Sequence, residues 1–209
     1  MKSLSIAITV VLILAAWGCV ASNASAEAAR TTQLHTIMSL LAAEEHVATA
    51  EDLARIGPDV PELLTTLAQD HQLDIAYRAR ATSYLGYYQG NSSVGRFLSS
   101  LVSTPNPPAP LLRRGLTALA HVSKGKAIPA IAPHLKSSDV LVREAAARAM
   151  VDTGDPAALK ALKEAAATER EPFLQKKMHD MAGTAVDHAR DQSPAVQRES
   201  NSEVQSTHY

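Results

Sequence analysis

Apolar side chains recur along the middle of the chain at the spacing of an α-helix. One such stripe is formed by Val60, Leu63, Leu64 and Leu67. The same pattern returns 34 residues later as Val94, Phe97, Leu98 and Leu101. Its first two positions recur after another 34 residues as Ile128 and Ile131, and after 31 more as Leu159 and Leu162. A stripe that repeats at a nearly fixed offset predicts an array of stacked helical pairs.

Polar residues and glycines mark where these helices should begin and end. Thr49 and Asp52 have the spacing of a capping box, and Gly57-Pro58 should end the helix that follows. Asp139 and Asp155 are natural N-cap residues for the two helices of the last pair. Gly154 can adopt the left-handed backbone that the turn between those helices needs. The proline-rich segment 104–110 predicts a rigid connector.

Two flanking segments should cover the ends of the array. Both carry apolar residues at helical spacing: Leu34, Ile37, Met38 and Leu41 in one, and Phe173, Leu174, Met178 and Met181 in the other. From Thr184 onward this periodicity is lost. The sequence therefore predicts an N-terminal cap helix in 27–48, a repeat array with a C-terminal cap helix in 49–183, and a disordered polar tail in 184–209.

One repeat resembles a known family. Its residues are Val142-Arg143, Ala145–Ala147, Ala149-Met150, Gly154-Asp155 and Ala158-Leu159, which together are similar to the short HEAT-like repeat named after phycobilisome lyases. Val151 departs from that pattern, which often has glycine there, and Gln89-Gly90 stands where an earlier copy should have Gly-Asp. The resemblance implies an all-α fold, a right-handed α-solenoid of about four helical hairpins. It also implies that the second helices line a concave face used for protein interaction, and some relatives take part in bilin attachment.

The N-terminus has the layout of a secretory signal. Lys2 precedes an apolar run, Leu4–Trp17, and small residues ending in Ala24-Ser25-Ala26 suggest cleavage before Glu27. We therefore expect residues 1–26 to be a signal peptide and the mature protein to be periplasmic or secreted, in a bacterium. In the alternative, the single cysteine, Cys19, becomes the lipidated first residue of a lipoprotein, and only then would the protein attach to a membrane.

Composition limits the chemistry. Hydrophobic residues make up 46% of the chain and aromatic residues only 4%, which favours helices over sheets. Without residues 1–26 the chain has 19 Lys and Arg against 21 Asp and Glu, so we expect no nucleic-acid binding. The eight histidines show no zinc-binding spacing, and no nucleophile and base are paired. The sequence thus predicts no catalytic residue, no metal site and no cofactor.

Repeat register indicates a partner-binding surface. Aligned positions on the second helices hold Thr66, Ser100 and His134, and the neighbouring column holds Glu62 and Arg96. Of the four tyrosines in one tyrosine-rich helix, Tyr77, Tyr84, Tyr87 and Tyr88, only Tyr87 is expected to face outward. Tyr87 and the five residues of the second helices are the predicted site for a protein or peptide partner. The function expected is a non-catalytic interaction or scaffold module of the cell envelope; the alternatives are a lyase-like or chaperone-like accessory factor with a small-molecule pocket, and a lipid-anchored assembly factor.

Overall fold

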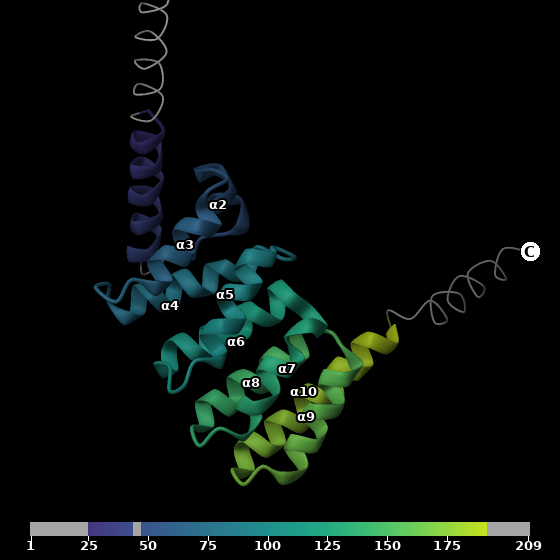
Figure 1. Ribbon diagram of the computed structural model, residues 1–209. Helices are drawn as coiled ribbons and strands as arrows, with labels where there is room; N and C mark the ends of the chain where they lie inside the picture. Colours follow the sequence, from purple (N-terminus) through teal and green to yellow (C-terminus); the bar gives the residue numbers. More distant parts are fainter. Residues whose placement is uncertain (1–24, 44–46, 192–209) are drawn as a thin grey trace, which may run out of the picture. The chain divides into compact units, whose positions relative to one another are not determined.

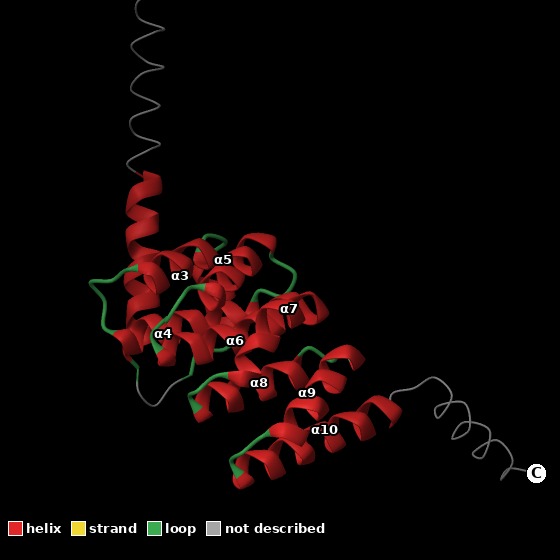
Figure 2. Cartoon of the chain, turned by 60° about the horizontal axis from the view of Figure 1, so that its bottom comes forward, coloured by secondary structure: helices red, strands yellow, loops and turns green. Residues whose placement is uncertain are grey.

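The computed structural model describes residues 25–43 and 47–191, and the described part of the chain is helical, without strands (Figures 1 and 2). This confirms the predicted all-α class. The signal segment up to residue 24, Cys19 and the segment 192–209 lie outside the described residues. The chain divides into two compact units, Met1–Leu63 and Leu64–Tyr209.

The first unit contains a helix over residues 25–42, followed by α2 (Ala50–Ile56) and the start of α3 (Val60–Gln69). The predicted capping box is confirmed: the Thr49 hydroxyl accepts a hydrogen bond from the Asp52 amide, and the Thr49 amide donates to Asp52 Oδ2 at 2.9 Å. Gly57 ends α2 with a φ of 147°. The core of this unit consists of the fully or almost fully buried side chains of Ile37, Leu41, Ala48, Leu53 and Val60.

The second unit is a series of helical pairs. Its elements are α4 (Ile75–Tyr84), η1 (Leu85–Tyr87), α5 (Ser92–Ser103), α6 (Ala109–Ser123), η2 (Lys124–Ala127), α7 (Ile128–Ile131), η3 (Ala132–Lys136), α8 (Val140–Asp152), α9 (Pro156–Thr168) and α10 (Pro172–Asp191). The first helices of successive pairs stack, since α6 packs against both α4 and α8. Among the second helices, α5 packs against α6, the first helix of the next pair, and α9 packs against α8, the first helix of its own pair (Figure 1). This is the stacked arrangement predicted from the repeating stripe.

Side-chain caps fix where these helices begin. Asp74, Asn91, Asp139 and Asp155 each accept a hydrogen bond from a backbone amide in the first turn of the helix that follows. The distance is 2.8 Å from Asp139 Oδ1 to the Leu141 amide and 2.8 Å from Asp155 Oδ1 to the Ala157 amide. Gly154 has a φ of 69°, so the turn between α8 and α9 uses the left-handed backbone that glycine adopts without strain.

Proline interrupts the second helix of the third pair. Pro129 and Pro133 lack amide hydrogens and occur at the starts of α7 and η3, so a single α-helical turn stands between two 3-10 segments. Prolines also shape the connector before α6. Pro110 lies in the first turn of α6, where its missing amide costs no hydrogen bond. The helix can therefore begin at Ala109, and the predicted connector 104–110 ends earlier than expected.

Small residues allow the helices of the second unit to approach closely. Ala146, Ala147 and Ala149 are fully buried in α8, which packs against α6. A Cβ atom on Gly115 would lie 3.1 Å from Leu101 Cδ2 and 3.2 Å from Val102 Cγ1, so a larger side chain there would push α5 and α6 apart. The alanine-rich run of the last pair therefore serves packing between repeats.

The last helix differs from the prediction in two ways. Helix α10 continues to Asp191, beyond the predicted tail boundary at residue 184. Phe173 was expected in the apolar stripe of this helix, but it is 74% exposed, while Leu174 and Met178 are buried. Lys177 Nζ lies 5.6 Å from the centre of the Phe173 ring and donates a hydrogen bond to Glu144 on α8 at 2.8 Å. Phe173 thus packs beneath a lysine at the surface and leaves the core to its neighbours.

Candidate partner-binding surfaces

Helix α5 presents two of the predicted site residues to solvent. Arg96 and Ser100 are both exposed and lie one helical turn apart. Arg96 is the only charged residue of α5, and its Nη2 donates a hydrogen bond of 3.3 Å to Ser93 Oγ in the same helix. Phe97 and Leu101, next to them in sequence, are only partly buried. This face of α5 therefore offers a cation, hydroxyls and some apolar surface together.

His134 is positioned by the fold. It is partly buried in η3, and its Nε2 lies 2.9 Å from the backbone carbonyl oxygen of Val102 in α5. Because a carbonyl oxygen only accepts hydrogen bonds, Nε2 carries the proton and donates it. The bond satisfies a carbonyl in the last turn of α5, which has no partner within the helix. The structure thus brings His134 next to the helix of Ser100, as repeat register predicted, but one of its ring nitrogens is already used.

The other two predicted residues of the second helices lie on α3. Glu62 and Thr66 are both exposed. Glu62 belongs to the first compact unit and Thr66 to the second. The role predicted for these residues stays a prediction.

Tyr87 lies among the first helices. It is 46% exposed, and its ring stacks on that of Tyr84, with centroids 6.3 Å apart and an interplanar angle of 21°. Tyr84 is buried, as expected, and so is the hydroxyl of Tyr88. Tyr87 therefore faces outward as predicted, but its neighbours come from α4 and α6, whereas Arg96, Ser100 and His134 lie on second helices.

A cavity of about 260 Å³ opens beside Tyr87. Its walls are the end of α4, the 3-10 segment η1 and the middle of α6. The lining residues are Ser83, Gly86, Tyr87, Arg114, Thr117, Ala118 and His121. At Gly86 the two walls come close, since a Cβ atom there would lie 3.4 Å from the Cα atom of Ala118. The cavity was not predicted, because the spacing of residues within single helices does not show which side chains two helices bring together.

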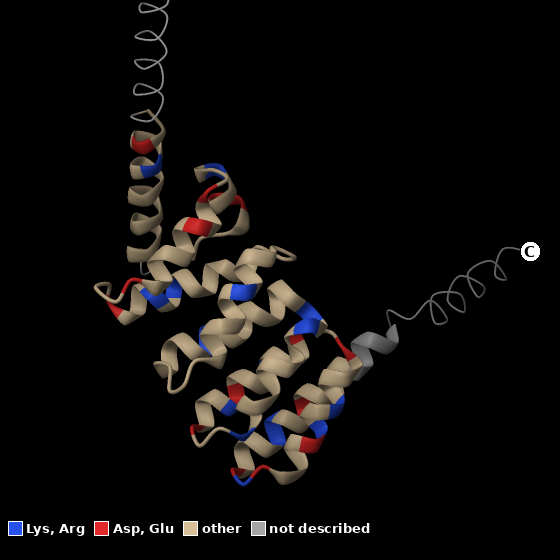
Figure 3. Cartoon of the chain, viewed as in Figure 1, with Lys and Arg blue, Asp and Glu red and all other residues tan. Residues whose placement is uncertain are grey.

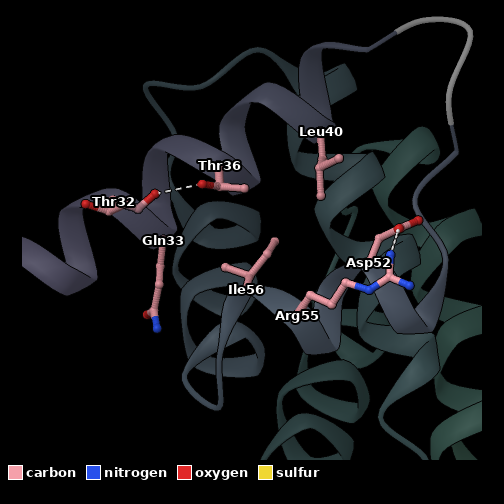
Figure 4. Close-up of a pocket in the computed structure, with 7 residues that line it drawn as sticks. All are labelled: Thr32, Gln33, Thr36, Leu40, Asp52, Arg55 and Ile56. Atoms are coloured by element: carbon pink, nitrogen blue, oxygen red, sulfur yellow. Dashed lines mark hydrogen bonds and ion pairs between the residues drawn. The ribbon is translucent and has the colours of Figure 1, made fainter.

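A second cavity, of about 420 Å³, lies within the first unit (Figure 4). Thr32, Gln33, Thr36 and Leu40 line it from the helix over residues 25–42, and Asp52, Arg55 and Ile56 line it from α2. Arg55 Nη1 lies 3.3 Å from Asp52 Oδ1, and the Thr36 hydroxyl donates to the carbonyl of Thr32 at 3.0 Å. Asp52 and Arg55 already pair with each other, whereas Gln33, which also lines the cavity, has a buried Oε1 atom without a hydrogen-bond partner among the described residues.

Two arginines near the start of first helices, Arg78 in α4 and Arg143 in α8, make contacts that stabilise the fold. Arg143 makes a bidentate ion pair with Glu169, with distances of 2.7 Å from Nε to Oε2 and 2.9 Å from Nη2 to Oε1. Arg143 Nη1 also donates to the carbonyl of Ser137 at 2.9 Å. At the corresponding place in α4, the buried Arg78 donates from Nε to the carbonyl of Ala68 at 3.1 Å. Glu169, an acid of the neighbouring loop, thus compensates the charge of Arg143, and both arginines are structural.

The pair changes the titration of both groups. The hydrogen bond from Arg143 lowers the pKa of Glu169 to about 2; burial opposes this, and the amides of Glu171 and Arg170 add to it. The same hydrogen bond raises the pKa of Arg143. On α8, hydrogen bonds from Lys177 and Arg148 lower the pKa of Glu144. The ion pairs of Glu169 with Arg143 and of Glu144 with Lys177 stabilise the packing of α8 against α10 and the segment before it. They account for the lowered pKa values without any catalytic proton transfer.

The middle repeats are basic, which the net charge of the whole chain conceals. Between Asp74 and Asp139 there is no Asp or Glu, whereas there are eight Lys and Arg residues: Arg78, Arg80, Arg96, Arg113, Arg114, Lys124, Lys126 and Lys136. Figure 3 shows the acidic residues on the helices before and after this segment. Sequence reasoning missed the segment because charge was summed over the chain, although a count along the sequence would have revealed it.

Among the described residues, no group of three or more His, Cys, Asp and Glu side chains could hold a metal ion. The helices in the described ranges also include none that is both long and apolar enough to cross a bilayer.

Comparison with known families gives one match. Residues 96–178 match the family model of HEAT repeats. None of the curated proteins compared matches the chain. The matched residues run from α5 into α10 and include the fourth pair, from which the resemblance was drawn. Residues 96–178 are therefore similar to HEAT repeats, and the stacked helices described in the second unit form an α-solenoid.

Proposed function

We propose that the protein is a non-catalytic interaction or scaffold module of the bacterial cell envelope. HEAT repeats commonly mediate protein–protein interaction, and families built from them are generally non-catalytic. On this proposal the partner binds to the second helices, at Glu62, Thr66, Arg96, Ser100 and His134, with Tyr87 as a further contact. The finer identification with repeats of phycobilisome-lyase type belongs to the same proposal.

The observation that carries the proposal is the solvent-exposed face of α5 that bears Arg96 and Ser100. Arg96 is exposed, and its side chain donates a long hydrogen bond of 3.3 Å to Ser93 of its own helix. A partner carboxylate could replace that bond at little cost, because a neutral hydroxyl is a weaker acceptor for a guanidinium. The partly exposed rings and aliphatic groups of Phe97 and Leu101 would supply apolar contact beside it.

Export is the second part of the proposal. It is supported by the order of Lys2, the apolar run Leu4–Trp17 and the small residues before Glu27. Mass spectrometry of the mature N-terminus from the native host tests it. We expect the chain to begin at Glu27, a lipidated Cys19 would establish the lipoprotein alternative, and an unprocessed Met1 would contradict export.

Crosslinking pull-down from the envelope fraction tests the interaction surface. The bait is the mature protein, beside a variant with Glu62→Lys and Arg96→Glu and a control variant with Glu164→Lys and Arg170→Glu. The control makes the same charge changes at exposed positions on α9 and at the loop before α10. A defined protein partner should be captured by the wild type and the control but lost from the first variant. Equal capture by all three would place the interaction elsewhere.

A further inference from the structure

The cavity beside Tyr87 holds a cation that the fold does not use. Arg114 is exposed and lines the cavity from α6, and it makes no side-chain hydrogen bond or ion pair with any residue in the described ranges. This contrasts with Arg78 and Arg143, whose guanidinium groups bond to carbonyls and a carboxylate of the second unit. A guanidinium beside a formed cavity is a ready donor for an anionic ligand.

The remaining polar groups of the cavity set what it can bind. The Ser83 hydroxyl donates to the carbonyl of Ala79 at 3.2 Å, and the Thr117 hydroxyl donates to the carbonyl of Arg113 at 3.4 Å. With these hydroxyl protons engaged, Arg114 and the ring of His121 are the main donors. The lining residues include no acid, so the local charge favours an anion.

One carboxylate lies near the cavity without closing it. Asp152 Oδ2 is 3.7 Å from His121 Nε2, and Lys124 Nζ lies 3.5 Å from the carbonyl oxygen of Asp152. The Asp152 carboxylate is thus placed beside His121 and makes no ion pair with Arg114. The wider segment between Asp74 and Asp139, with eight basic residues and no acid, would attract an acidic partner to this region.

We propose that the cavity binds a carboxylate side chain, from Asp or Glu, on an acidic segment of a protein partner. This proposal rests on the proposed interaction function, but it places the contact on the first helices of the pairs. There the guanidinium group of Arg114 would donate hydrogen bonds to the partner's carboxylate, and the exposed ring of Tyr87 would pack against the methylene groups of the same side chain. A volume of about 260 Å³ is below the usual range for small-molecule pockets of roughly 300 to 1,000 Å³, which suits one anchoring side chain.

Fluorescence anisotropy with a labelled decaglutamate peptide tests this on the mature protein at physiological salt. Three variants each remove one positive charge: Arg114→Gln in the cavity, Arg96→Gln on α5, and Arg170→Gln before α10. We expect Arg114→Gln to raise the Kd about tenfold, which corresponds to losing one charge-assisted contact. Arg170→Gln should change the Kd by less than about twofold, because exposed charges at a distance are screened by salt. Thermal unfolding followed by circular dichroism verifies that each variant folds.

Four outcomes would overturn the assignment. They are the absence of decaglutamate binding, equal binding of decaglutamine, equal weakening by Arg114→Gln and the other two variants, and tighter binding of a thymidine decamer than of decaglutamate. The third would show diffuse electrostatic attraction, and the fourth would favour nucleic acid. The pull-down with the Glu62 and Arg96 variant leaves Arg114 unchanged, so this proposal and the proposed function can fail separately.

Discussion

Replacing Glu169 with glutamine should remove an ion pair that joins α8 to the loop between α9 and α10. Glu169 follows α9 directly, its side chain accepts hydrogen bonds from Arg143 on α8, and its Oε1 also accepts the amides of Arg170 and Glu171 at 2.9 Å just before α10. The Glu169 side chain is only 4% exposed and that of Arg143 only 15%, so water screens the pair weakly. Glutamine keeps the shape and one acceptor oxygen, and the substitution therefore isolates the charge.

The lowered pKa sets the size of the effect. The Glu169 carboxyl has a pKa of about 2 in the folded protein, against an ordinary value of 4.5. Each unit of difference corresponds to about 1.4 kcal/mol, so the ionised pair contributes on the order of 3 kcal/mol to the free energy of unfolding at neutral pH. Because the folded pKa lies below the unfolded one, this contribution is complete above about pH 5 and decreases as the pH falls toward 2.

Urea unfolding followed by circular dichroism at several pH values measures this contribution. At pH 7 we expect Glu169→Gln to lower the free energy of unfolding by about 3 kcal/mol relative to wild type. At pH 3.5 the difference should be smaller by about 1.4 kcal/mol. Glu164→Gln is the matched control, since Glu164 is exposed on α9. An equal effect of both substitutions, or a difference that does not change with pH, would refute the reasoning.

Three further substitutions test the packing and the turns of the last pair. Ala146→Trp should lower the free energy of unfolding by about 1 to 3 kcal/mol, because Ala146 is fully buried in α8. The control Ala157→Trp should not, because Ala157 is exposed. If thermal unfolding were unchanged in both variants, α8 would not pack through its alanines. Asp155→Ala should cost about 1 kcal/mol in urea unfolding by removing the cap of α9, whereas Asp155→Asn should retain most of the stability, and equal loss in both would argue against the cap. Gly154→Ala should cost about 1 kcal/mol because φ is 69°, and a gain in stability would contradict that backbone conformation.

Local signals in the sequence were sufficient to predict most of the fold. The capping residues Thr49, Asp74, Asp139 and Asp155 act within three residues of their partners, so their roles can be read from the chain directly. The stripe that begins with Val60 is buried, as expected for apolar residues at helical spacing, and in the copy that begins with Val94 the side chains of Val94 and Leu98 are buried while Phe97 and Leu101 are partly buried. Phe173 fits the same spacing and is nevertheless exposed, since Leu174 and Met178 already fill the contact of α10 with its neighbours.

The surfaces were harder to predict because they depend on contacts between helices. Repeat register placed His134 correctly near α5, but the hydrogen bond from its ring to Val102 depends on a distance that only the folded chain defines. The cavity that joins Tyr87 with Arg114 and His121 combines residues from two different helices. The basic character of its surroundings could have been predicted from the sequence, because there is no acid between Asp74 and Asp139. The net charge of the whole chain is near zero and does not show this local excess.

Site-specific photo-crosslinking from Ser100 in living cells tests the interaction surface most directly. A photoreactive phenylalanine analogue at Ser100 would lie on the solvent-exposed face of α5, and the same analogue at the exposed Ser138 in the loop before α8 is the control. We expect a discrete protein adduct from Ser100 and none from Ser138. An adduct from Ser138 alone, or none from either position under conditions where both variants fold, would contradict a partner bound across the second helices.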